Sequence, residues 1–157
     1  MIEDIRRKQS IRFVTMEEGA NTYAGELYRI DYSYRKVIVN YRNTPHQKVL
    51  YKLYQKVQKV YSNDWLLHFN DNWQQTLDNT AGWVTNSKQS QYNFFNNYVK
   101  PVIDKKQRLF VIISDALRCE NGWALWSEIQ RKKRYEATLD YMITNLPSYT
   151  QLGMASL

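Results

Sequence analysis

The sequence is poor in the residues that staple small folds or bind transition metals. It contains one cysteine, Cys119, so no disulfide can form within the chain, which favours a reducing compartment. Its two histidines, His46 and His68, lie far apart, which argues against a histidine-based metal site within these residues. No apolar run approaches the roughly 18 residues of a membrane span, and the polar segment 1–9 is not followed by a signal-peptide core. We therefore expect a cytoplasmic protein with no membrane partner.

Aromatic and basic residues are abundant instead. Thirteen Tyr, five Trp and five Phe residues favour a folded chain with broad packing surfaces. The net charge of +7 permits a polyanionic partner such as DNA but does not demonstrate one. The densest basic cluster is 131–134, which has two interpretations: a solvated helix C-terminus, where cations suit the helix dipole, or a contact with nucleic acid.

Residues 1–105 show the period of amphipathic helices. Apolar side chains recur every three or four residues over 23–41, and the same spacing returns over 49–61. Thr44 is predicted to cap the second of these helices, with Pro45 in its first turn. A polar stretch near 78–90 interrupts the pattern before a third helix. We expect a helical hairpin or bundle over this region.

The period changes near residue 108. Residues 109–114 form a short apolar run typical of a buried strand, and 116–131 have helical character. Residues 135–144 then alternate between apolar and polar side chains, as a half-buried strand does. Strand, helix and strand in this order predict a βαβ unit, and hence an α/β fold class for the fragment.

This topology would bring two polar side chains together. The strands of a βαβ unit are parallel, so the residues that follow them lie at the same edge of the sheet, where α/β folds bind ligands. Asp115 follows the first predicted strand, and Thr150 lies a few residues past the second. A hydroxyl is a poor nucleophile unless a base or a metal activates it, and a carboxylate such as Asp115 could hold that metal. Thr150 would also sit at the N-terminus of a helix, where backbone N–H groups bind phosphate.

Ordinary structural roles explain the same residues from spacing alone. Asp115 could cap a helix that begins at Ala116, and Thr150 could cap the helix that follows it, a task that Ser148 could share. A nucleotide-binding Rossmann-like fold is disfavoured, because no glycine-rich turn follows the run 109–114.

Two sequence blocks favour the catalytic interpretation. The blocks SDALR (114–118) and PSYTQLGMASL (147–157) occur together, and the segment 109–157 that contains them resembles the start of the PglZ domain. PglZ proteins belong to the alkaline-phosphatase superfamily and act in bacterial phage growth limitation and bacteriophage exclusion (BREX). The resemblance implies an N-terminal helical region, 1–105, and a truncated alkaline-phosphatase-like domain, 106–157, that opens with a βαβ unit.

The resemblance also implies the chemistry. It makes Thr150 the nucleophile of a metal-dependent phosphatase or phosphodiesterase, and Asp115 and Thr150 ligands of a divalent metal such as zinc. Cys119 departs from the family pattern, where an aromatic residue is usual, and this could loosen packing behind Asp115. The further Asp and His ligands of the superfamily come from later segments, so we expect this fragment to be inactive alone and not to bind the metal stably.

A non-catalytic function is the alternative. The basic, tyrosine-rich helical region would then be a module that binds nucleic acid or other phage-defence proteins, and salt-sensitive DNA binding that survives loss of Thr150 would support it.

Overall fold

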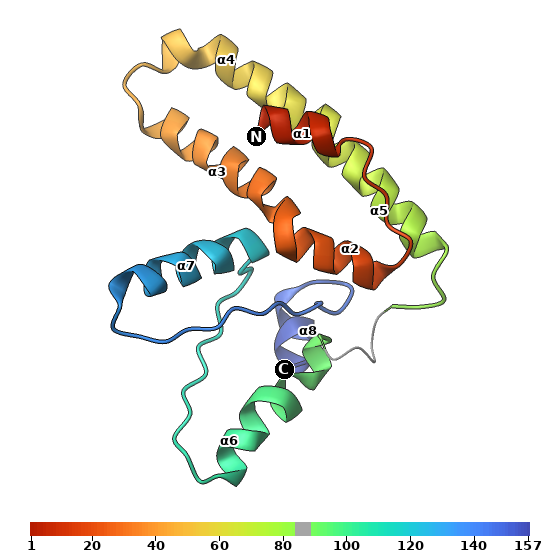
Figure 1. Ribbon diagram of the computed structural model, residues 1–157, viewed down its shortest axis with the longest axis vertical. Helices are drawn as coiled ribbons and strands as arrows, with labels where there is room; N and C mark the ends of the chain where they lie inside the picture. Colours follow the sequence, from red (N-terminus) through yellow and green to blue (C-terminus); the bar gives the residue numbers. More distant parts are fainter. Residues whose placement is uncertain (84–88) are drawn as a thin grey trace. The chain divides into compact units, whose positions relative to one another are not determined.

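The computed structural model describes residues 1–83 and 89–157, which form two compact units, Met1–Gly82 and Trp83–Leu157 (Figure 1). The predicted polar interruption near 78–90 therefore lies partly outside the described residues. These two units are defined by the packing of the chain. The predicted boundary after residue 105 is of another kind, since it separates a helical region from a family domain, and it stays a prediction. No helix in the described part of the chain combines the length and the apolar character that crossing a bilayer requires.

The first unit is a helical hairpin with the short helix α1 packed against it, as predicted from the apolar period. Helices α2, η1 and α3 follow one another without a break, as do α4, η2 and α5, and the two resulting rods run in opposite directions (Figure 1). The segments η1 and η2 are π-helical, and each joins two α-helices of its rod. The elements are α1 (Ile2–Lys8), α2 (Met16–Thr22), η1 (Tyr23–Leu27), α3 (Tyr28–Asn43), α4 (Gln47–Lys59), η2 (Val60–Leu67) and α5 (His68–Asp78).

Apolar and aromatic side chains from both rods form the core of this unit. Its buried members are Ile5, Phe13, Leu27, Ile30 and Trp65. Full burial of side chains of this size contributes about 1.5–3 kcal/mol each to the free energy of unfolding. The core therefore ties the entering segment and α1 to both arms of the hairpin.

Two pairs of stacked tyrosines join the arms along their length. The rings of Tyr34 and Tyr61 are parallel with centroids 3.7 Å apart, and those of Tyr41 and Tyr54 lie 3.9 Å apart. The turn between α3 and α4 differs from the prediction for Thr44 and Pro45. Because α4 begins at Gln47, His46 occupies the N-cap position, and Thr44 Oγ1 instead accepts a hydrogen bond from the backbone N–H of His46.

The second unit contains shorter helices joined by extended segments. Helix α7 confirms the helical character expected for 116–131, although it begins at Cys119. The π-helical turn η4 ends where α6 begins, and Pro101 lies in the first turn of α6, where a missing N–H is tolerated. The elements are η3 (Gln91–Asn93), η4 (Phe95–Val99), α6 (Lys100–Asp104), α7 (Cys119–Lys132) and α8 (Thr150–Ala155).

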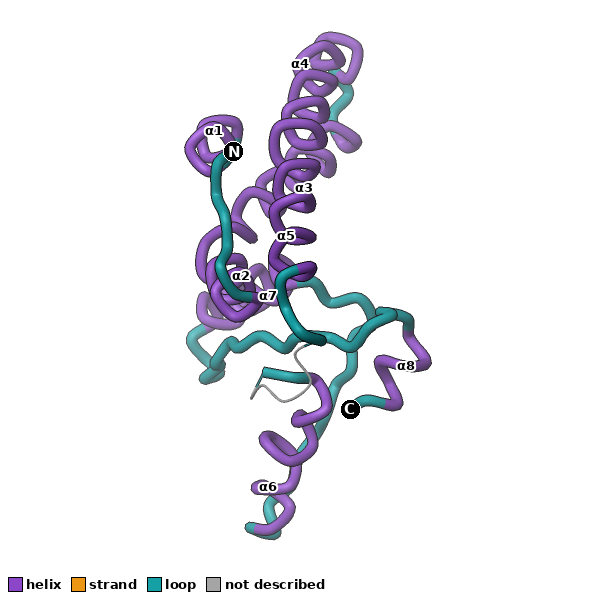
Figure 2. The backbone as a smooth tube through the Cα atoms, turned by 90° about the vertical axis from the view of Figure 1, so that its right-hand side faces the viewer, coloured by secondary structure: helices purple, strands orange, loops and turns teal. Residues whose placement is uncertain are grey.

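The predicted α/β fold class and its βαβ unit are wrong. The described residues contain no strand, and Figure 2 shows helices and loops alone. Segments 109–114 and 135–144 are extended but do not pair with each other. The second segment makes one isolated parallel bridge, between Ile143 and Ser90, with backbone hydrogen bonds from Gln91 N–H to Ile143 O and from Ile143 N–H to Gln89 O.

The predicted strand 109–114 does not form because no neighbouring strand pairs with it in the described structure. A strand is stabilised by the hydrogen-bond ladder with its neighbour, and apolar sequence alone does not supply that neighbour. Within the described residues, 109–114 has no such ladder. Its side chains are consequently exposed, with Phe110 at 79% and Ile112 at 92% of their full accessible surface.

Candidate functional site

The structure brings Asp115 and Thr150 together. Thr150 Oγ1 donates a hydrogen bond to Asp115 Oδ2 across 3.0 Å, and both side chains are exposed. The two residues are 35 positions apart, and both belong to the second unit. The predicted proximity of this hydroxyl and this carboxylate is thus present, although it does not arise from neighbouring strands.

Neither residue caps a helix with its side chain. Helix α7 begins at Cys119, beyond Ala116, and Arg118 occupies its N-cap position. Helix α8 begins at Thr150 itself, with Tyr149 at the N-cap and no side-chain hydrogen bond to the first turn. The two capping roles that spacing allowed are therefore absent, and the side chains of Asp115 and Thr150 bond to each other instead.

The backbone next to Asp115 is strained. Ala116 has a φ of +52°, in the left-handed region that side chains with a Cβ rarely adopt. Such a conformation costs on the order of 1 kcal/mol, and surrounding contacts must hold it in place. It turns the chain sharply between the extended run 109–114 and helix α7, which leaves Asp115 at the turn.

Gln91 supports the segment that carries Thr150, and sequence reasoning missed it. Its backbone N–H donates to Ile143 O at 3.1 Å, and its side-chain Nε2 donates to Gly153 O of α8 at 2.7 Å. Trp83 Nε1 donates to Thr144 O at 3.0 Å. These contacts fix both ends of the loop that leads to Thr150, so Gln91 is a positioning residue for the hydroxyl.

Other members of the SDALR block and its surroundings have different environments. Arg118 is exposed, whereas Glu120 is buried in the first turn of α7, where a negative charge suits the helix dipole. Cys119 is partly buried and forms no disulfide within the described residues. The basic cluster 131–134 includes the last turn of α7, and Arg131 forms a 2.6 Å ion pair with Glu128. This placement agrees with the interpretation of the cluster as a helix C-terminus.

The described residues do not form a complete metal site. They contain no group of three or more His, Cys, Asp or Glu side chains placed to hold one ion. Asp115 and Thr150 offer two oxygen donors with suitable chemistry, but a catalytic zinc takes three protein ligands. The number of donors therefore does not fit a resident metal, and the predicted metal-ligand roles stay predictions.

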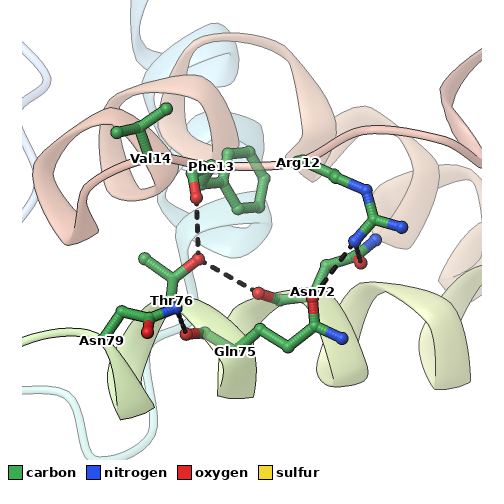
Figure 3. Close-up of a pocket in the computed structure, with 7 residues that line it drawn as sticks. All are labelled: Arg12, Phe13, Val14, Asn72, Gln75, Thr76 and Asn79. Carbon is green, nitrogen blue, oxygen red and sulfur yellow. Dashed lines mark hydrogen bonds between the residues drawn. The ribbon is translucent and has the colours of Figure 1, made fainter.

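A separate pocket of about 320 Å³ lies in the first unit, between the segment before α2 and helix α5 (Figure 3). Arg12 Nη1 donates to Asn72 Oδ1 and Gln75 Oε1, both at 3.1 Å, and Thr76 Oγ1 donates to Phe13 O or to Asn72 O, each at 3.0 Å. These bonds join α5 to the preceding segment, so the polar groups that line the pocket already satisfy one another.

The region that carries Asp115 and Thr150 is similar to a known protein family. Residues 94–157, which include both Asp115 and Thr150, match the family model described as "BREX system PglZ alkaline phosphatase-like domain". The chain is 40% identical over 143 residues to "Alkaline phosphatase-like protein BrxZ" of Escherichia coli O9:H4 (strain HS). It is 32% identical over 137 residues to "Alkaline phosphatase-like protein PglZ" of Bacillus cereus (strain H3081.97). Each match covers 86% of this chain and 16% of the relative. No solved structure matches the chain.

The similarity is to alkaline phosphatase-like proteins, and the matched domain model is that of BREX systems. The chain belongs to the PglZ family, as the SDALR and PSYTQLGMASL blocks indicated. It spans about a sixth of the length of these two relatives.

Proposed function

We propose that this chain contributes the nucleophile, Thr150, to a phosphoester hydrolase of a BREX phage-defence system. The hydrogen bond from Thr150 to Asp115 carries the proposal, because it lies inside the region that matches the family and joins a hydroxyl to a carboxylate. An aliphatic hydroxyl attacks phosphorus effectively when a neighbouring group fixes its direction and accepts its proton.

The two side chains can perform a balanced displacement. As Thr150 Oγ1 forms a bond to phosphorus, the bond from phosphorus to the leaving oxygen breaks, and the hydroxyl proton passes to Asp115 Oδ2. The leaving oxygen takes a proton from water. A second water molecule then cleaves the phosphothreonine, and Asp115 returns its proton to Thr150. A divalent metal would supply electrostatic stabilisation in such enzymes, but the donors described here are too few for any step to be assigned to it.

We expect the 157 residues alone to be inactive. Asp115 and Thr150 are exposed, so water competes with their interactions and the charge that develops on phosphorus is stabilised weakly. Efficient hydrolysis requires further charge-stabilising groups and a less hydrated site. The phosphoester itself could be a monoester or a nucleic-acid diester.

The test uses a protein of the relatives' length that contains these residues. Release of p-nitrophenolate from p-nitrophenyl phosphate and from bis(p-nitrophenyl) phosphate distinguishes monoesterase from diesterase activity. Thr150→Ala should lower kcat/KM by at least about a thousand-fold, as removal of a nucleophile does. Thr150→Ser keeps a hydroxyl and should retain more activity than Thr150→Ala. In the wild-type protein, acid quenching during turnover should trap a phosphoryl group on Thr150.

Ser148→Ala is the matched control, since it removes an exposed hydroxyl two residues from Thr150. It should leave kcat/KM within a few-fold of the wild-type value. Equal activities of Thr150→Ala and Ser148→Ala would refute Thr150 as the nucleophile.

One observation favours a second candidate function, a basic helical module that binds nucleic acid or other defence proteins. Within the helical hairpin of the first unit, residues 32–63 contain seven Lys and Arg residues and no carboxylate, so this segment is a second basic region beside the cluster 131–134. Binding of this kind needs neither Asp115 nor Thr150.

A further inference from the structure

The net charge of the chain resides in one stretch of 32 residues. Residues 32–63 contain seven Lys and Arg residues and no Asp or Glu, whereas the rest of the chain contains fifteen of each sign. This stretch, which covers most of α3, all of α4 and the start of η2, therefore carries a charge of +7 with no carboxylate to offset it. Such a segregation of charge is unnecessary for solubility, which scattered charges supply equally well.

Four lysines of this stretch form a stripe along α4. Lys48, Lys52, Lys56 and Lys59 are all exposed, and at 3.6 residues per turn they fall within an arc of about 80°. The stripe is about 16 Å long at 1.5 Å per residue. We call this set the lysine stripe.

The stripe points away from the rest of the hairpin. Tyr54 and Val57 mark the inner face of α4, since Tyr54 stacks on Tyr41 of α3 and Val57 is buried. Helical geometry places these two residues more than about 100° from the middle of the lysine stripe. The four lysines therefore take no part in the packing of α4 against α3, and their side chains extend into solvent.

The part of the chain that the structure describes offers these four lysines no carboxylate partner. Among residues 1–83 and 89–157, none of the four takes part in an ion pair, in contrast to Lys8, which lies 2.5 Å from Glu26. Like charges spaced four residues apart on a helix destabilise it by about 0.2–0.5 kcal/mol per pair. The stripe thus opposes the stability of α4, and an external polyanion would relieve that repulsion.

We propose that the lysine stripe of α4 binds the phosphate backbone of double-stranded nucleic acid. A lysine ammonium is a point charge that neutralises phosphate without reading base edges, so the contact is independent of sequence. A duplex carries one charge per about 1.7 Å of its axis, so the stripe faces a dense row of phosphates over its whole length. This inference locates the second candidate function and rests on it, and it requires no chemistry at Asp115 or Thr150.

A membrane surface fits this helix less well. Interfacial helices bury a continuous apolar face opposite their lysines. In α4, Tyr54 stacks on Tyr41 of α3 and Val57 is buried, which removes the middle of that face from the surface. The exposed apolar residues of this helix are spread over an arc of about 200° and form no continuous face; they are Val49, Leu50, Tyr51 and Leu53.

The experiment measures binding of the 157-residue chain to a fluorescent DNA duplex of about 20 base pairs, by anisotropy over a range of salt concentrations. The stripe variant carries Lys48→Gln, Lys52→Gln, Lys56→Gln and Lys59→Gln. We expect its affinity at moderate salt to fall at least about tenfold and its salt slope to decrease by about 3 to 4, close to 0.9 per lost phosphate contact.

The matched control removes four charges elsewhere, through Arg131→Gln, Lys132→Gln, Lys133→Gln and Arg134→Gln. It should weaken binding less than about threefold, and Thr150→Ala should bind like the wild type. Circular dichroism verifies that both quadruple variants keep their helices.

Each failure has its own meaning. If the wild-type chain does not bind duplex even at low salt, the inference is wrong, and the second candidate function is left only as binding of other defence proteins. If it binds but the stripe variant and the control weaken equally, the surface is wrong and the function survives. Equal or tighter binding to polyglutamate, or to vesicles of anionic phospholipid, would overturn nucleic acid as the partner.

Discussion

Trp65 donates its indole N–H to Asp31 Oδ1 across 3.1 Å, and this bond joins the two arms of the helical hairpin. The Tyr61 hydroxyl donates to the same oxygen at 3.0 Å, and the Tyr23 hydroxyl donates to the other oxygen. One carboxylate on α3 thus organises donors from η1 and η2. Because Trp65 is almost completely buried, its N–H has no access to water as an alternative partner.

Replacement of this carboxylate should destabilise the first unit. Asp31→Ala leaves the three donors without their acceptor, and we expect a loss of about 2–4 kcal/mol in the free energy of unfolding. Asp71→Ala, on the exposed side of α5, is the matched control and should change stability by less than about 0.5 kcal/mol. Urea unfolding followed by tryptophan fluorescence measures both, and equal losses would show that the Asp31 cluster contributes nothing specific.

Gln91 should control the order of the segment around Thr150. Gln91→Ala removes the 2.7 Å bond to Gly153 O, so amide hydrogens of residues 150–155 should exchange faster, by about five- to thirtyfold for 1–2 kcal/mol. Gln151→Ala substitutes an exposed glutamine of the same helix and should leave exchange unchanged. Unaltered exchange in Gln91→Ala would mean that α8 is held by other contacts.

Tyr98 should make the second unit sensitive to alkali. Partial desolvation of the Tyr98 side chain, which is 44% exposed, together with the charge of Asp140 and the hydrogen bond to it, raises the pKa of Tyr98 above 10.0. The folded state therefore holds this proton more tightly than the unfolded state, so the stabilisation is complete below pH 10.0 and is lost as pH rises through the raised pKa. Thermal unfolding between about pH 8 and 11 should show a steeper alkaline decline for the wild type than for Tyr98→Phe.

The matched control for this titration is Tyr92→Phe, which removes a more exposed hydroxyl of the same unit. Its alkaline decline should follow that of the wild type. If Tyr98→Phe also follows the wild type, the hydrogen bond to Asp140 has no influence on the pH dependence.

Zinc should not stabilise the 157-residue chain. Two oxygen donors bind a divalent ion weakly, and with a dissociation constant near or above about 1 mM, 0.1 mM metal adds at most about 0.1 kcal/mol. The melting temperature should therefore be the same in zinc and in EDTA. A rise of several degrees that Asp115→Asn abolishes would reveal a metal site that the described donors do not explain.

The helices could be predicted because their signal is local. Apolar residues at a spacing of three and four mark the arms over 23–41 and 49–61, and each arm needs only the other to bury its stripe. The start of the second arm was harder to place, because Thr44 and Pro45 lie in a turn before α4 and are not its cap and first turn. Turn chemistry at Thr-Pro supports both arrangements.

The proximity of Asp115 and Thr150 could be predicted from the sequence, but the reason given for it is wrong. The proximity of Asp115 and Thr150 was inferred from two parallel strands, yet the described structure has none, and residues around Trp83 and Gln91 hold the segment before Thr150 instead. Period-two alternation over 135–144 indicates an extended chain but not its partner. Gln91 had no signal of its own, because it lies among several other Gln and Asn residues of similar character.

The tyrosine stacks give the hairpin a built-in optical probe. Aromatic rings held in fixed, asymmetric contact contribute to near-ultraviolet circular dichroism, and the contribution disappears when packing loosens while helices persist. Tyr34 with Tyr61 and Tyr41 with Tyr54 sample two different levels of the same hairpin. Single Tyr→Phe replacements would assign the signal to each pair. The order in which the two signals disappear would then show whether the arms of the hairpin separate in one step or separate first near the turn between α3 and α4.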